Sequence, residues 1–158
     1  MKDLVSLLEG LGAKKVKTYI QSGNVILKST NDPSRLSEQI SQAIQQRFGF
    51  TPLVLILSRV EFENAISENP FPEAVFNPSS LHLGFLARPT EKPNLEGLEK
   101  LKHESEKYHL TDRVFYLYAP EGVGRSKLAA NCEKLLGVPM TDRNWKTVCK
   151  IQTLIEEN

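Results

Sequence analysis

The sequence predicts an α+β fold built from two α/β plait halves, of which the first lacks its opening strand. Two observations lead to this class. Segments with apolar residues three or four positions apart alternate with short apolar or alternating runs, which is the pattern of mixed helices and strands. A stretch with three prolines and no periodicity divides the chain. We therefore predict an N-terminal half over residues 1–68, a proline-rich linker over 69–80, and a C-terminal half over 81–158 that ends in a helix.

The first half begins with a helix, because its leucines follow helical spacing. A hairpin comes next, since residues 21–24 are turn formers and glycine accepts the positive φ of a tight turn. Asp32 and Pro33 are typical of a helix N-terminus, and Ser58 with Glu61 forms a capping-box pattern. The predicted elements are a helix over 1–11, strands over 14–20 and 25–27, a helix over 33–48, a strand over 53–57 buried on both faces, and a short helix after residue 58.

The second half also resembles a plait; it has the opening strand that the first half lacks, but it ends in a helix. Gly137 is expected to end its second helix. The last predicted helix then stands where a βαββαβ plait would have its closing strand. The predicted elements are a strand over 81–87, a helix over 94–106, strands over 108–110 and 114–118, and helices over 126–136 and 142–157.

The opening strand of a plait lies in the middle of its sheet, so its absence from the first half leaves backbone groups unpaired. Each such group costs about 1–3 kcal/mol if it is buried. We expect one of three solutions: another segment fills the gap, two chains pair through the open sheet edge as a homo-oligomer, or residues are missing before Met1.

Composition and charge limit the function classes. The 158 residues are 40% hydrophobic, enough for a core, and the formal net charge of +1 argues against a polybasic protein. A phosphate or nucleic-acid site must therefore come from local clustering of charge. Cys132 and Cys149 fall at apolar positions of predicted helices, so we expect two buried thiols and no metal. No signal peptide and no run of about 18 apolar residues is visible, which predicts a soluble cytoplasmic protein without membrane contact.

Basic residues stand at two predicted helix starts, where the backbone is itself partly positive. Arg125 and Lys127 begin one helix, and Arg143 and Lys146 lie in the first turn of the last. Each cation at such a helix start costs about 0.3–1 kcal/mol because it is repelled by the helix dipole. An anion bound between them would be attracted to both the cation and the helix start. Ordinary solvated cations are the competing interpretation, since Arg59 begins another helix without a comparable loop.

The loop before the first of these helices and the hairpin turn supply the other candidates. Gly122 and Gly124 would let backbone N–H groups approach an anion closely. The polar turn at 21–24 either serves the hairpin alone or donates hydrogen bonds to a ligand. The glycine spacing is neither that of a P-loop nor that of a dinucleotide fingerprint, so no cofactor is predicted. The candidate ligand-binding residues are Gln21, Ser22, Asn24, Gly122, Gly124, Arg125, Lys127, Arg143, Asn144 and Lys150.

Four spaced blocks of the sequence carry a family resemblance. They are Thr-Tyr-Ile-Gln-Ser-Gly-Asn-Val at 18–25, Asn-Pro-Phe at 69–71, Gly-Val-Gly-Arg-Ser-Lys-Leu at 122–128, and Arg-Asn-Trp-Lys-Thr-Val-Cys-Lys at 143–150. In this order they resemble the bacterial family catalogued as domain of unknown function sixteen-ninety-seven. The resemblance implies two ferredoxin-like halves and a strand with a glycine-rich turn before Met1. It implies no established activity.

Catalytic patterns are weak. His82, His103 and His109 are scattered and near no acid–nucleophile pattern, and His82 alternates with leucines on a strand, so it faces solvent or a covering helix. Ser126 is expected to cap a helix. Tyr116 shares a sheet face with the tyrosine two residues on, which is either core or a surface for stacking bases.

Three functions are compatible with these residues, and the sequence leaves open whether the protein is an enzyme. The first is a binding module for an anionic, phosphate-bearing ligand such as a nucleotide or single-stranded nucleic acid. The alternatives are a metal-independent enzyme on a phosphorylated substrate, and a structural or partner-binding protein.

Overall fold

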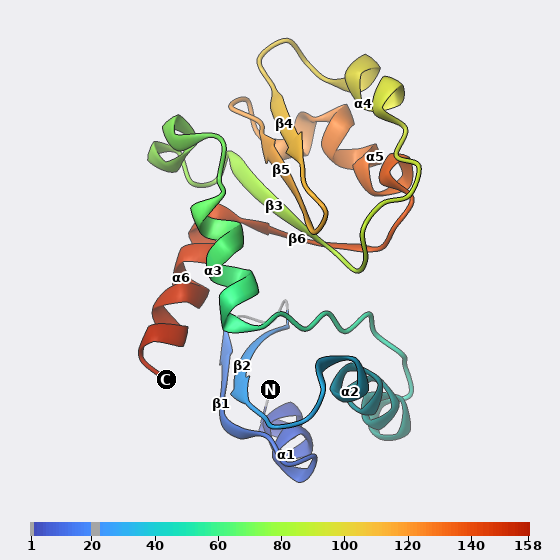
Figure 1. The fold of residues 1–158 in the computed structure, drawn as a ribbon, viewed down its shortest axis with the longest axis vertical. Helices are drawn as coiled ribbons and strands as arrows, with labels where there is room; N and C mark the ends of the chain where they lie inside the picture. The colour runs from blue at the N-terminus through green and yellow to red at the C-terminus, as the bar shows by residue number, and fades with distance from the viewer. Residues whose placement is uncertain (1, 20–22) are drawn as a thin grey trace. The chain divides into compact units, whose positions relative to one another are not determined.

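The structure is a computed structural model that describes residues 2–19 and 23–158 (Figure 1). The chain forms two compact units: unit 1 comprises residues 1–63 and 150–158, and unit 2 comprises residues 64–149. The chain passes from one unit to the other within helix α3 (Arg59–Ser67) and again within helix α6 (Trp145–Glu156). No helix in the described part of the chain has the length and apolar character needed to cross a membrane.

Unit 2 contains a four-stranded antiparallel sheet with the strand order β4-β5-β3-β6. This is the βαββαβ arrangement of a complete plait, in which the first strand lies between the third and the fourth. Helices α4 and α5 cover one face, where their leucines pack on the side chains of β5. The elements are β3 (Leu81–Leu86), α4 (Leu95–Leu101), β4 (Lys107–Leu110), β5 (Val114–Tyr118), α5 (Lys127–Leu136) and β6 (Met140–Asn144).

The closing strand β6 corrects the prediction of a helix from residue 142. Residues 140–144 pair along their whole length with β3, which gives this inner strand a partner on its second edge. The helix begins later because the cap is Asn144, whose Oδ1 accepts a hydrogen bond from the Thr147 N–H at 2.9 Å. The prediction that Arg143 lies in the first turn of the last helix is therefore wrong, since Arg143 lies on β6 and only Lys146 and Lys150 lie on α6.

The other face of the unit 2 sheet packs against residues that precede β3. The Tyr116 side chain is fully buried there, and its hydroxyl donates to the Ala65 carbonyl at 2.6 Å. Tyr116 therefore belongs to the core and offers no surface for stacking bases. The predicted linker 69–80 lies in this unit: it contains the 3-10 helix η1 (Pro72–Phe76), and Phe71 and Ala74 are buried.

Unit 1 is built on the hairpin of β1 (Lys14–Tyr19) and β2 (Asn24–Lys28), with helices α1 (Lys2–Gly10) and α2 (Pro33–Phe48). Asp32 caps α2 by accepting the Arg35 N–H, and Gly49 ends the helix in the left-handed conformation. The core is formed by apolar side chains of both helices and both strands. Its buried members are Leu8, Ala13, Leu36, Ile40 and Ile44.

Residues 53–57 do not form the strand predicted for them, nor are they buried on both faces; Leu53 is 53% exposed. The closing strand of a plait pairs only with its opening strand, and no described residue of unit 1 occupies that position. Two hydroxyls of α2 hold the segment instead. Ser37 donates to the Val54 carbonyl at 2.8 Å, and Ser41 donates to the Pro52 carbonyl at 3.3 Å. The predicted capping box of Ser58 and Glu61 follows and is confirmed.

Candidate functional site

The loop between β5 and α5 places four of the predicted ligand-binding residues together. Gly122 has a φ of 96°, which favours glycine, and the short 3-10 helix η2 (Val123–Arg125) follows it. Ser126 then caps α5 by accepting the Ala129 N–H at 3.0 Å, as predicted. The helix start at Lys127 is also close to the prediction. A side chain at Gly124 would meet open space, so this part of the backbone is accessible.

The two cations of this loop form no ion pair with an acid in the part of the chain that the structure describes. Arg125 and Lys127 are exposed, and the first turn of α5 contains no acid. The one acid of the loop, Glu121, is bound elsewhere: its carboxylate is 3.0 Å from His103 Nδ1 and accepts the Ser105 hydroxyl at 2.7 Å. Among the described residues neither Arg125 nor Lys127 forms an ion pair.

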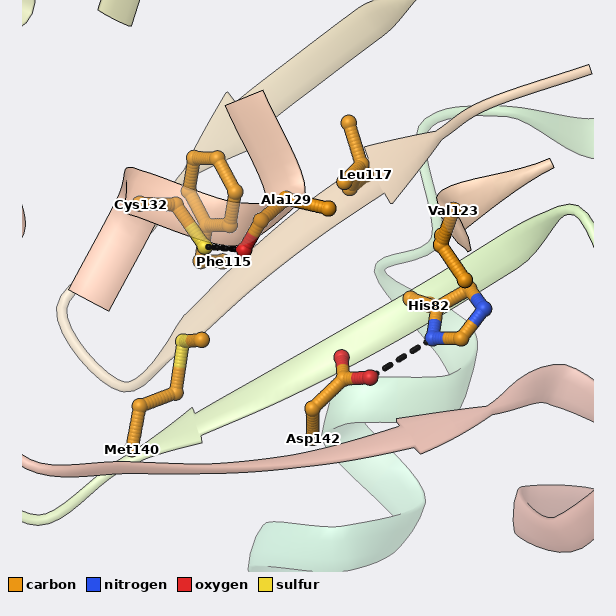
Figure 2. A pocket seen from close by; sticks show the side chains of 8 residues that line it. All are labelled: His82, Phe115, Leu117, Val123, Ala129, Cys132, Met140 and Asp142. Atoms are coloured by element: carbon orange, nitrogen blue, oxygen red, sulfur yellow. Dashed lines mark hydrogen bonds and ion pairs between the residues drawn. The ribbon is translucent and has the colours of Figure 1, made fainter. Parts of the chain in front are cut away.

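A buried histidine lies close to this loop, and its partner is not among the residues predicted from the sequence. His82 on β3 is 8% exposed, and its Nδ1 is 2.7 Å from Asp142 Oδ2 on β6 (Figure 2). Its Nε2 is 3.2 Å from the Ser79 carbonyl oxygen. Both oxygens can only accept, so both contacts are hydrogen bonds at once only when the ring carries two protons. The prediction that His82 faces solvent or a helix is resolved in favour of the covered face, the one that α5 packs on.

The pair could not be found by spacing because it depends on the register of β3 and β6. Asp142 is directly opposite Gly84, two residues along from His82, so the three positions share one sheet face. Gly84 has no side chain to separate the two groups. The predicted helix at residue 142 hid this neighbourhood. The one usable signal was Asn144 three residues before Thr147, a cap spacing that would have started the helix later.

His82 and Asp142 line a cavity of about 90 Å³ between the sheet and α5. Figure 2 shows the side chains of β5, β6 and α5 around it, and Val123 joins it to the basic loop. Its walls are mainly apolar. The lining residues are His82, Phe115, Leu117, Val123, Ala129, Cys132, Met140 and Asp142.

The two cysteines have different surroundings, and neither forms a disulfide. Burial, with a smaller effect of the Asp142 charge, raises the pKa of the Cys132 thiol to about 11. The thiol in the cavity therefore stays protonated at neutral pH and is a poor nucleophile. Cys149 on α6 is exposed, so the prediction of two buried thiols holds only for Cys132. Within residues 2–19 and 23–158 no three His, Cys, Asp or Glu side chains are grouped as a metal site would require.

The other predicted site residues lie apart from the loop. Arg143 is opposite Leu83 on β6, so it points to the sheet face opposite that of Asp142. Its guanidinium donates to the Asp142 carbonyl at 2.7 Å, and burial lowers its pKa. Asn144 caps α6, as described above. An anion shared by Arg125 and Arg143 is therefore not supported, because the loop borders the face that Arg143 points away from.

Three predicted residues come from the hairpin turn, and one from the middle of α6. Asn24 is buried at the start of β2 and donates to the Tyr19 carbonyl at 3.2 Å, which is a structural role in the hairpin. Gln21 and Ser22 lie outside the described residues. Lys150 is exposed on α6 and belongs to unit 1.

The fold and the site define an α+β protein with a complete plait unit and a basic loop at the start of α5. The family described as "Protein of unknown function (DUF1697)" matches residues 1–116, and the chain belongs to this family, which confirms the resemblance. The solved structure of the conserved bacterial protein SP0830 from Streptococcus pneumoniae is similar, with a TM-score of 0.70 and 25% sequence identity. The match covers 98% of this chain and 87% of that one. No curated protein matches the chain.

Proposed function

We propose that the protein is a binding module for a small phosphate-bearing ligand such as a nucleotide, held at the loop of residues 122–127. The observation that carries the proposal is the pair of exposed cations, Arg125 and Lys127, at the start of α5 without an acidic partner among the described residues. A phosphate would neutralise both cations and the partial positive charge of the helix start. Two free charges and an accessible glycine backbone fit this chemistry better than a purely structural turn.

The backbone of the loop is also held in place at two positions, Val123 and Ser126. Ser126 fixes the first turn of α5, and Val123 is anchored in the cavity below the loop. Arg125 lies between these two anchors and Lys127 directly follows Ser126, and both side chains are exposed. Binding therefore orders only the ends of two long side chains, which keeps the entropic cost low.

Calorimetric titration of the protein with AMP at low salt tests this function. Arg125→Gln with Lys127→Gln removes both charges, and we expect affinity to fall by at least about tenfold per residue, since a charge-assisted hydrogen bond contributes about 1.5–3 kcal/mol. Arg113→Gln with Lys134→Gln is the matched control, because it removes two exposed charges from the same unit.

The control should bind AMP like the wild type. Equal affinity of the wild type and the loop variant would contradict the proposal, as would the lack of any heat of binding for the wild type at millimolar AMP.

A metal-independent enzyme is the second candidate, and the pair of His82 and Asp142 favours it. The sequence offered no general acid or base, whereas a histidine oriented by a carboxylate is a common proton-transfer arrangement. The imidazole would exchange its contact with the Ser79 carbonyl for one with a substrate. His82→Gln should abolish any phosphomonoester hydrolysis while leaving AMP affinity within about twofold. A wild type inactive on a phosphomonoester panel would remove this candidate.

The proposal includes a cytoplasmic location, because both cysteines remain as thiols and such thiols persist in a reducing compartment.

A further inference from the structure

One end of the β1–β2 hairpin in unit 1 brings three lysines together. Lys14 and Lys28 are directly opposite each other in the antiparallel pair, and the pairing is irregular between Lys14 and Lys17. Lys15 lies in this irregular stretch with a φ of 51°, in the left-handed region that residues other than glycine seldom adopt. Strained positions of this kind gather at functional sites. Here the strain falls on the residue that completes the lysine cluster.

The lysine side chains repel one another, and the acids nearby are already engaged. The charge of Lys15, then its hydrogen bond, then desolvation and the charge of Arg59 lower the pKa of the Lys28 amine. On α3, Glu63 pairs with Arg59, and Glu61 accepts the backbone N–H at its own helix start. None of the three lysines has an ion pair with an acid in the described part of the chain. Like charges directly opposite in a sheet are unfavourable, so this arrangement works against stability.

An aromatic ring lies on the same sheet face as this cluster. Asn24, Ile26 and Lys28 alternate along β2 and share one face, and Tyr19 is the direct partner of Asn24. Tyr19 is half-buried, and its direct partner Asn24 is buried. Bases of a single strand can stack on such a ring, whereas bases inside a duplex cannot.

We propose that Lys14, Lys15 and Lys28, here called the hairpin cluster, bind the phosphate backbone of single-stranded nucleic acid. All three side chains are exposed and come from two neighbouring strands. Long side chains spread over an open surface suit phosphates that repeat along a chain, whereas a single small anion is held by donors that converge in a pocket. The cluster belongs to unit 1 and does not rest on the proposed function of the loop in unit 2.

Fluorescence anisotropy with a labelled oligo(dT) of roughly 20 nucleotides, measured between about 50 and 200 mM salt, tests the hairpin cluster. Each phosphate contact to a single strand contributes about −0.7 to the slope of log affinity against log salt. The triple variant Lys14→Gln, Lys15→Gln, Lys28→Gln should therefore have a slope shallower by about 2. Its thermal midpoint should equal or exceed that of the wild type, because the mutual repulsion is removed. If the triple variant unfolds, Lys15→Gln alone should change the slope by about 0.7.

The control triple Lys92→Gln, Lys100→Gln, Lys134→Gln removes the same charge from exposed positions of unit 2 and should keep the wild-type slope. Arg125→Gln with Lys127→Gln should also keep it, which separates this surface from the loop site. Equal slopes for the hairpin variant and its control would overturn the proposal. So would a wild type that ignores oligo(dT) at about 50 mM salt but sediments with phosphatidylserine vesicles, since the surface would then serve an anionic membrane.

Discussion

Tyr116 offers a sharp test of how the unit 2 sheet is packed. Its side chain is fully buried, its hydroxyl donates to the Ala65 carbonyl at 2.6 Å, and burial, with a smaller effect of the Glu68 charge, raises the pKa of the phenol from 10.0 to about 12. In Tyr116→Phe the carbonyl loses its buried partner. We expect this variant to be less stable than the wild type by about 1–2 kcal/mol at neutral pH.

The raised pKa of Tyr116 predicts that this order reverses at high pH. The unfolded chain releases the phenolic proton first, so the stability due to this group is complete below pH 10 and is lost as the pH rises from 10.0 towards the folded pKa of about 12. A shift of two units corresponds to about 2.7 kcal/mol. With a hydroxyl contribution of about 1.5 kcal/mol, the wild type and Tyr116→Phe should have equal stability at about pH 11.

Urea unfolding of both proteins, followed by the fluorescence of Trp145 over this pH range, measures the crossing. Lysines and the other tyrosines titrate in both proteins, so their effects cancel in the difference between the two free energies of unfolding. Two parallel curves, with the wild type more stable at every pH, would refute the buried environment assigned to the phenol.

Two further predictions test the cavity and its surroundings. Gly84→Ala should cost about 1–3 kcal/mol of stability in thermal or urea unfolding, because the new methyl group would collide with the Met140 side chain; Met140→Ala should recover part of the loss, and additive effects would contradict the contact. A colorimetric thiol reagent at neutral pH should modify one thiol per native chain, at the exposed Cys149, because Cys132 is buried with a pKa of about 11; rapid modification of two thiols would show that α5 does not cover the cavity as described.

Signals that act within a few residues were predicted correctly from the sequence. The Asp32 cap, the capping box at Ser58 and the left-handed Gly137 are all present in the structure. Each depends on hydrogen bonds or φ values within one turn, so the local residue types suffice. The same holds for Ser126, which placed the start of α5 and with it the basic loop.

Features that depend on distant partners were predicted poorly. Residues 53–57 have a strand composition, but they lack a neighbouring strand to pair with in the described part of unit 1. Residues 140–144 have little strand character, yet they pair with β3, whose second edge would otherwise have unpaired backbone groups. The contact of His82 with Asp142 follows from that pairing alone. The pair of His82 and Asp142 therefore could not be predicted before the strand order was known, whereas the cationic loop could.

The stretch from Pro52 to Ser58 has a practical consequence for handling the protein. Two serine hydroxyls of α2 donate to its carbonyls, but no strand among residues 2–19 and 23–158 pairs with its backbone. Proteases bind their substrates as extended chains. This stretch is in neither a helix nor a sheet, so cleavage here requires no unfolding of either. Limited digestion should therefore cut here early, which would open unit 1 and leave the continuous stretch of unit 2, residues 64–149, uncut.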